Sequence, residues 1–144
     1  MDLASVPETI RTIIEQAGGL GLRGAFAYIG AQQFRYRCAQ QEGEYRSGYP
    51  SRLTSEGGPP RVDFDVGLQF LVNGKPGRRW SMVIVYEPDD LYSVWLVEGH
   101  AGRKAESMVL ACVREVYCDT LQSVIEETYD RAINEYNRGF IPLG

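Results

Sequence analysis

The fold of this chain is decided by residues 61–97, which read RVDFDVGLQFLVNGKPGRRWSMVIVYEPDDLYSVWLV. Strand-forming residues fill three runs, which are separated by Asn73-Gly74 and by the segment Glu87-Pro88-Asp89-Asp90. Short runs of this kind are typical of β-strands, and both separators are turn sequences. The stretch therefore predicts three consecutive antiparallel strands.

The two faces of these predicted strands differ along the stretch. In the first strand, one face carries the apolar side chains, which are Val62, Phe64, Val66, Leu68 and Phe70. The second and third strands, near residues 80–86 and 91–97, are apolar on both faces. A sheet with two apolar faces must be covered twice. We therefore expect a helix on one face, and a second helix or another copy of the chain on the other.

A short amphipathic helix is expected near the N-terminus. Ser5 is a candidate N-cap, Pro7 falls in the first turn, and Glu8 occupies the capping-box position. The apolar residues of this helix share one face and are Val6, Ile10, Ile13, Ile14 and Ala17. Gly18-Gly19 is expected to end the helix.

Two segments have patterns that fit both strand and helix. Residues 25–39 contain alternating aromatic and polar side chains, so we interpret them as two short strands broken at Gly30, with a single helix as the alternative. Residues 107–117 lack a helical stripe. A continuous helix over residues 104–137 would be about 50 Å long. We therefore predict a fourth strand at 107–116.

A longer amphipathic helix is expected to follow this strand. Asp119 is its candidate N-cap, with Gln122 three residues later. Its apolar stripe comprises Leu121, Val124, Ile125, Thr128, Ala132, Ile133 and Tyr136. Gly139 is expected to end it, and the apolar residues 140–143 to fold back onto the core.

Together these elements predict one α+β domain over residues 1–144. We expect an antiparallel meander sheet of about five strands, flanked by the N-terminal helix and the longer C-terminal helix. One long loop, over residues 41–60, is rich in glycine, serine and proline. Loops of this length are often functional or disordered.

Composition narrows the classes of partner. The net charge of −4 argues against a nucleic acid or an anionic membrane as the partner. No apolar run approaches the ~18 residues that a membrane span requires, and no signal peptide is evident. Three cysteines at unrelated spacings, Cys38, Cys112 and Cys118, favour reduced thiols in the cytoplasm.

The candidate catalytic residues are few. His100 is the only histidine, and Glu98 lies beside it in the sequence. Histidine is the usual general base near neutral pH, so this pair is the best candidate for acid–base chemistry; the alternative is an exposed turn residue. The glycine-rich residues 19–24 follow a helix rather than a strand, so we interpret them as a helix exit and not as a nucleotide loop. We expect no metal and no cofactor.

Carboxylates and arginines are expected to meet on the polar face of the sheet. Asp63 and Asp65 lie two residues apart, and Glu87, Asp89 and Asp90 gather in a turn. The arginines expected nearby are Arg35, Arg37, Arg61 and Arg79. We interpret this distribution as cross-strand ion pairing rather than a cation site.

The aromatic residues of the central strands suggest a binding site. Trp80, Tyr86, Tyr92 and Trp95 crowd onto two neighbouring strands, where their polar atoms need partners. The leading hypothesis is a non-enzymatic binding module, whose aromatic-lined cavity between the sheet and the C-terminal helix takes a small apolar or aromatic molecule. One alternative is a homodimeric interaction domain or chaperone-like adaptor that uses an apolar sheet face. A second is a small enzyme that uses His100 and Glu98.

Overall fold

A computed structural model describes residues 3–39, 46–74, 79–99 and 108–137. The main sheet has five antiparallel strands in the order β1-β4-β5-β6-β7, which are Gln32–Cys38, Val66–Val72, Arg79–Tyr86, Tyr92–Gly99 and Val109–Val116. A second, two-stranded sheet pairs β2 (Arg52–Thr54) with β3 (Arg61–Asp63). The helices are α1 (Glu8–Gln16), α2 (Ala25–Tyr28) and α3 (Leu121–Asn137), and the short 3-10 turns are η1 (Leu3–Ser5) and η3 (Cys118–Thr120).

This arrangement confirms the predicted α+β fold. Strands β4 to β7 form a meander in which each strand pairs with the next, and β1 adds to the β4 edge. The fourth meander strand expected near residues 107–116 is present as β7. No helix in the described part of the chain is long and apolar enough to cross a membrane.

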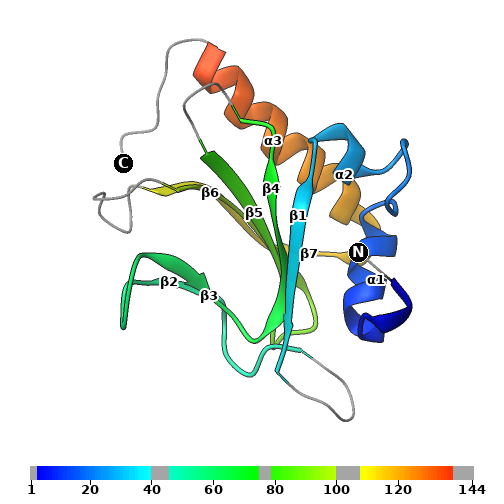
Figure 1. The fold of residues 1–144 in the computed structure, drawn as a ribbon, viewed down its shortest axis with the longest axis vertical. Helices are drawn as coiled ribbons and strands as arrows, with labels where there is room; N and C mark the ends of the chain where they lie inside the picture. Colours follow the sequence, from blue (N-terminus) through cyan, green and yellow to red (C-terminus); the bar gives the residue numbers. More distant parts are fainter. Residues whose placement is uncertain (1–2, 40–45, 75–78, 100–107, 138–144) are drawn as a thin grey trace.

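All three helices lie on the same face of the main sheet (Figure 1). Their buried side chains pack against β4, β5 and β6 in one core, to which α1 contributes Ile10, Ile13 and Ile14, and α3 contributes Leu121, Ile125 and Ala132. From the sheet side, the largest residues of this core that are less than 2% exposed are Leu68, Phe70, Met82, Ile84 and Leu96. The residues of the two expected amphipathic stripes whose side chains the structure describes are therefore on the surfaces that the helices bury.

The opposite face of the sheet is covered by another part of the same chain. Figure 1 shows the β2–β3 hairpin on the side away from the helices. Its residues pack on the sheet in a second, smaller cluster of Val62, Phe64, Val83, Val85, Trp95 and Val97, with Leu53 against it. Over this part of the face, the hairpin provides the cover that we expected from a second helix or another copy of the chain.

The strand predicted from Arg61 to Val72 is in fact two strands. β3 ends at Asp63 and β4 begins at Val66, so the chain bends at Phe64-Asp65. Phe64 packs on one face of the sheet and Leu68 on the other, so the prediction of one shared face was wrong. Gly67 makes the bend possible, because a Cβ there would lie 2.9 Å from the Phe64 ring.

The prediction of a strand at residues 26–28 was also wrong. Residues 25–28 form the short helix α2, and Gly30, with φ of +67°, follows it before β1 begins at Gln32. The alternation of Phe26 and Tyr28 misled because residues two apart on a helix lie about half a turn apart, so that Phe26 is buried and Tyr28 is exposed. Phe26 makes edge-to-face contacts with Phe34 and Phe70, at centroid distances of 5.2 and 5.1 Å.

Both predicted N-caps are displaced. Ser5 lies in η1 and α1 begins at Glu8, with Pro7 in the cap position and no side-chain cap hydrogen bond. Asp119 lies within η3 rather than capping α3. In each case a 3-10 turn precedes the helix and occupies the place expected of the cap. Gly139 and the apolar tail lie outside the described residues.

Candidate functional site

The predicted catalytic pair is only partly described. His100 lies outside the described residues. Glu98 is on β6, opposite Trp80 of β5, and is 3% exposed. Among the residues that the structure describes, no group of three or more histidine, cysteine or acidic side chains is arranged to hold a metal ion.

The four candidate aromatic residues divide between the two faces of the sheet. Trp80, Tyr86 and Tyr92 belong to the core beneath the helices, whereas Trp95 belongs to the cluster beneath the β2–β3 hairpin. The Tyr92 hydroxyl donates a hydrogen bond of 2.5 Å to Gln16 Oε1, and burial raises the pKa of Tyr92. The structure therefore brings only Tyr86 and Tyr92 together, at a centroid distance of 5.4 Å, because Trp80 lies at the other end of β5 and Trp95 on the opposite face.

A network of polar side chains fixes the hairpin segment to the sheet. We call Ser51, Glu87, Ser93, Trp95 and Arg114 the anchor cluster. The Glu87 carboxylate accepts hydrogen bonds from the Ser51 amide (2.9 Å), the Ser51 hydroxyl (2.5 Å) and the Ser93 hydroxyl (2.6 Å). Arg114 adds an ion pair of 2.9 Å to Glu87. Every oxygen of this buried carboxylate therefore has a partner.

Arg114 uses the rest of its guanidinium within the same cluster. Its Nη2 donates 2.7 Å to the Ser51 carbonyl, and its charge lies 5.3 Å from the centre of the Trp95 ring. The Trp95 Nε1 in turn donates to the Ser51 hydroxyl at 2.9 Å. A buried network in which the polar groups have hydrogen-bond partners stabilises the fold. We therefore infer that the anchor cluster stabilises the packing of the β2–β3 hairpin on the sheet.

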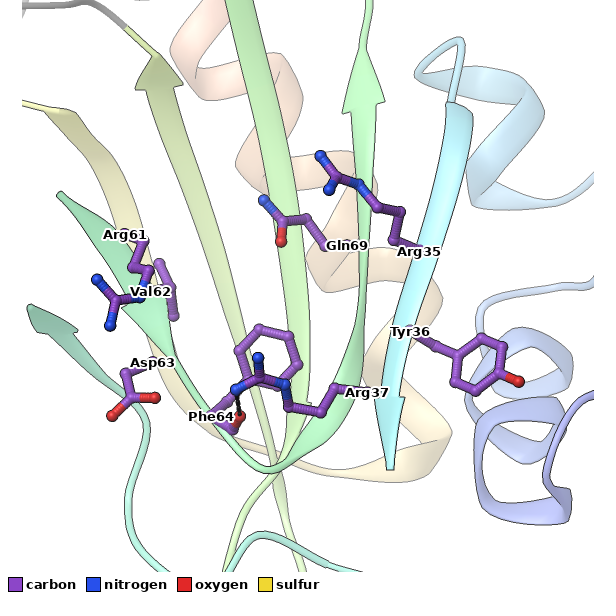
Figure 2. A pocket seen from close by; sticks show the side chains of 8 residues that line it. All are labelled: Arg35, Tyr36, Arg37, Arg61, Val62, Asp63, Phe64 and Gln69. Atoms are coloured by element: carbon purple, nitrogen blue, oxygen red, sulfur yellow. Dashed lines mark hydrogen bonds between the residues drawn. The ribbon is translucent and has the colours of Figure 1, made fainter. Parts of the chain in front are cut away.

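A different polar surface lies on the same face of the sheet, beside the hairpin. Two hollows of about 290 Å³ each share Arg35 and Gln69 in their linings. Their arginines come from three strands, and we call the two neighbouring hollows together the arginine groove, defined by Arg35, Arg37, Arg61 and Arg79. Figure 2 shows Arg61 on β3 and Arg35 and Arg37 on β1, with Gln69 of β4 between them.

Strand register explains why these arginines share one face. Arg35 is paired with Gln69 and Arg37 with Gly67. The pairing shifts between Gln32 and Arg35, where Gln33 has a positive φ of 56°. This bulge sets the register in which Arg35 and Arg37 line the groove while Phe34 and Cys38 pack against the helix-side core.

The positive charge of the groove is only partly used within the protein. Arg37 donates 3.3 Å to the Phe64 carbonyl, and Arg61 donates 2.9 Å to the Glu56 carbonyl. The side chains of Arg35 and Arg79 make no hydrogen bond or ion pair with any described residue. Within the described part of the chain, two cationic groups therefore face the groove without an anion beside them.

Asp63, the one acidic residue among the described lining residues, is already paired. Asp63 lies 3.4 Å from Arg52, its cross-strand neighbour, and accepts a 3.0 Å hydrogen bond from the Tyr49 hydroxyl. Burial, followed by the hydrogen bond to Asp63, raises the pKa of Tyr49 to about 12. Cross-strand pairing of Asp63 is thus confirmed, but with Arg52 rather than with the arginines of the groove.

Arg35, Arg37, Arg61 and Arg79 were expected near one another, but as ion-pair partners of carboxylates, so the groove itself was missed. The signal was the pair Arg35 and Arg37, which alternates with apolar side chains in a strand and so places two cations on one face. The three cysteines, all in the described part of the chain, form no disulfide.

A scan against protein-family models finds no matching family, and searches of the curated proteins and of the solved structures find no similar protein.

Proposed function

We propose that this chain is a non-enzymatic binding module that holds an anionic partner in the arginine groove. The observation that carries the proposal is the pair Arg35 and Arg79, which line the groove without a described anionic neighbour. In a chain of net charge −4, such a local excess of positive charge stands out from the rest of the molecule.

Guanidinium groups suit this task. Each presents several N–H donors in a planar fork that matches the two oxygens of a carboxylate or phosphate. The floor of the groove adds Gln69 and Ser81, whose side chains can donate further hydrogen bonds. An anion in the groove therefore meets charge and directed donors together.

The helix-side face offers less support for a ligand site. The space between the main sheet and α3 holds buried side chains of both elements, among them Phe70, Leu96 and Ile125. A small apolar molecule would have to displace this packing. The binding hypothesis is therefore better supported on the hairpin side of the sheet, and the ligand class changes from apolar to anionic.

Calorimetric titration with citrate and with pyrophosphate, at low ionic strength, tests the proposal. We expect saturable binding by the native chain and a loss of at least tenfold in the Arg35→Ala/Arg79→Ala double variant. The matched control is Arg131→Ala, which removes an exposed arginine on α3 and should leave binding unchanged. The proposal fails if neither anion binds, or if the double variant binds as well as the control.

A further inference from the structure

We infer that the occupant of the arginine groove is an extended acidic peptide segment of a partner protein. The inference rests on the proposed function and adds to it the shape and chemical class of the ligand. Three features of the groove carry it: its length, the spacing of its charges, and its aromatic lining residues, of which Phe64 and Phe70 are buried and Tyr36, 45% exposed, points away from the groove.

The length follows from the strand register. Arg37 is level with Gly67 of β4, and Arg79 lies one residue beyond the Val72–Trp80 pair, level with Asn73. Six residues of strand separate these two levels, which corresponds to about 20 Å. A citrate-sized anion reaches only part of this distance, whereas an extended peptide of about six residues covers it.

The charge spacing also matches a peptide. Arg35 and Arg37 lie two residues apart on β1, or about 7 Å along the strand. Alternate side chains of an extended peptide repeat at the same interval. A segment with acidic residues at every second position can therefore present one carboxylate to each of these two arginines.

A single-stranded nucleic acid has the charge but lacks a stacking surface here. Binding of unpaired bases depends on exposed aromatic rings as well as on cations. Among the lining residues, Phe64 is 6% exposed and has Arg37 over its ring, and Phe70 is 1% exposed. Figure 2 shows the Tyr36 side chain directed away from the groove. Carboxylates on a peptide need no such platform.

A length series of fluorescein-labelled oligoglutamates, measured by anisotropy, tests the inference on the full chain. We expect the affinity to rise from two to six residues and to level off beyond that. Glu-Ser-Glu-Ser-Glu-Ser should bind within about threefold of hexaglutamate, despite half the charge, because only alternate positions face the arginines. Arg35→Ala and Arg79→Ala should each weaken hexaglutamate about tenfold, with Arg131→Ala as the unchanged control.

The outcomes separate the two proposals. If citrate binds as tightly as hexaglutamate, the proposed anion site stands and the extended occupant is overturned. If an oligothymidylate of six phosphates binds more tightly than hexaglutamate at physiological salt, the peptide class is overturned. If no anion binds at all, both proposals fall.

Discussion

The two edge strands of the main sheet carry arginines on the same face, and these arginines have opposite surroundings. Arg114 on β7 contacts the Glu87 carboxylate, the Ser51 carbonyl and the Trp95 ring. The side chain of Arg35 on β1 has no hydrogen bond or ion pair with a described residue. Arginine thus stabilises the fold at one edge, and at the other edge we propose that it binds an anion. Substitutions at the two edges should therefore affect different measurements.

The largest effect is expected for Glu87→Ala. This change removes the acceptor shared by Ser51, Ser93 and Arg114 in a buried site. We expect the free energy of unfolding to fall by about 3 kcal/mol, measured by urea denaturation. Glu127→Ala, which breaks an exposed pair on α3, is the control and should cost less than about 0.5 kcal/mol. A loss for Glu87→Ala no larger than that of the control would contradict the assignment.

Gly67→Ala should be the second most destabilising change, and it tests the packing of Phe64 on the main sheet. The new Cβ would lie 2.5 Å from the Ile84 carbonyl oxygen and 2.9 Å from the Phe64 ring. Overpacking of this kind costs about 2 kcal/mol. Gly58→Ala, where the methyl group meets nothing within 4 Å, is the matched control in the same thermal or urea unfolding series. Equal stabilities for both variants would refute the close contact beneath Phe64.

The direct comparison of the two edges is Arg114→Ala against Arg35→Ala. The first leaves Glu87 with its hydroxyl and amide donors but removes an ion pair, so we expect a loss of about 1 kcal/mol in unfolding free energy. The second should change stability by less than about 0.5 kcal/mol. Anion binding should show the reverse order. If Arg35→Ala destabilises the fold more than Arg114→Ala does, the division of roles is wrong.

The smallest effect concerns Tyr49, whose hydroxyl donates a hydrogen bond to Asp63 in the lining of the arginine groove. Because the pKa of Tyr49 rises from 10.0 to about 12 on folding, its hydroxyl stabilises the folded state fully below pH 10. This contribution is lost as the pH rises through about 12, since the unfolded chain releases the proton first. Urea denaturation between pH 9 and pH 12 should therefore show a shallower decline for Tyr49→Phe than for the native chain. Superimposable declines would exclude this coupling.

Local patterns predicted most of the secondary structure but not the bend at Phe64-Asp65. Period-two alternation continues from Val62 through Phe70 without a break in the sequence. The side chains nevertheless change face, because the absence of a side chain at Gly67 lets the Phe64 ring fold down onto the sheet. Alternation indicates which residues are buried, but not on which face of the sheet. Here Val62 and Phe64 are buried beneath the hairpin, whereas Val66, Leu68 and Phe70 are buried beneath the helices.

The candidate site was less accessible to sequence reasoning than the fold. The arginine groove joins β1, β3, β4 and β5, and the segments that carry Arg35 and Arg61 lie 26 positions apart. These arginines were expected near one another, but as partners of carboxylates. Asp63 instead pairs with Arg52, and the pairing of β1 with β4 across the long loop is specified by no local pattern. The anchor cluster was missed for the same reason, since it brings Ser51 from the loop to Glu87 and Arg114.

The strand order also implies a sequence of events as the chain folds. Strands β4 to β7 pair with their neighbours in the chain, whereas β1 must reach β4 across residues 39–65. Closing that loop costs entropy before any contact repays it, so the meander should form first and β1 should dock last. Pulsed hydrogen exchange should then protect the amides of β5 and β6 before those of β1. The protein would acquire its complete set of groove arginines only in the final step of folding.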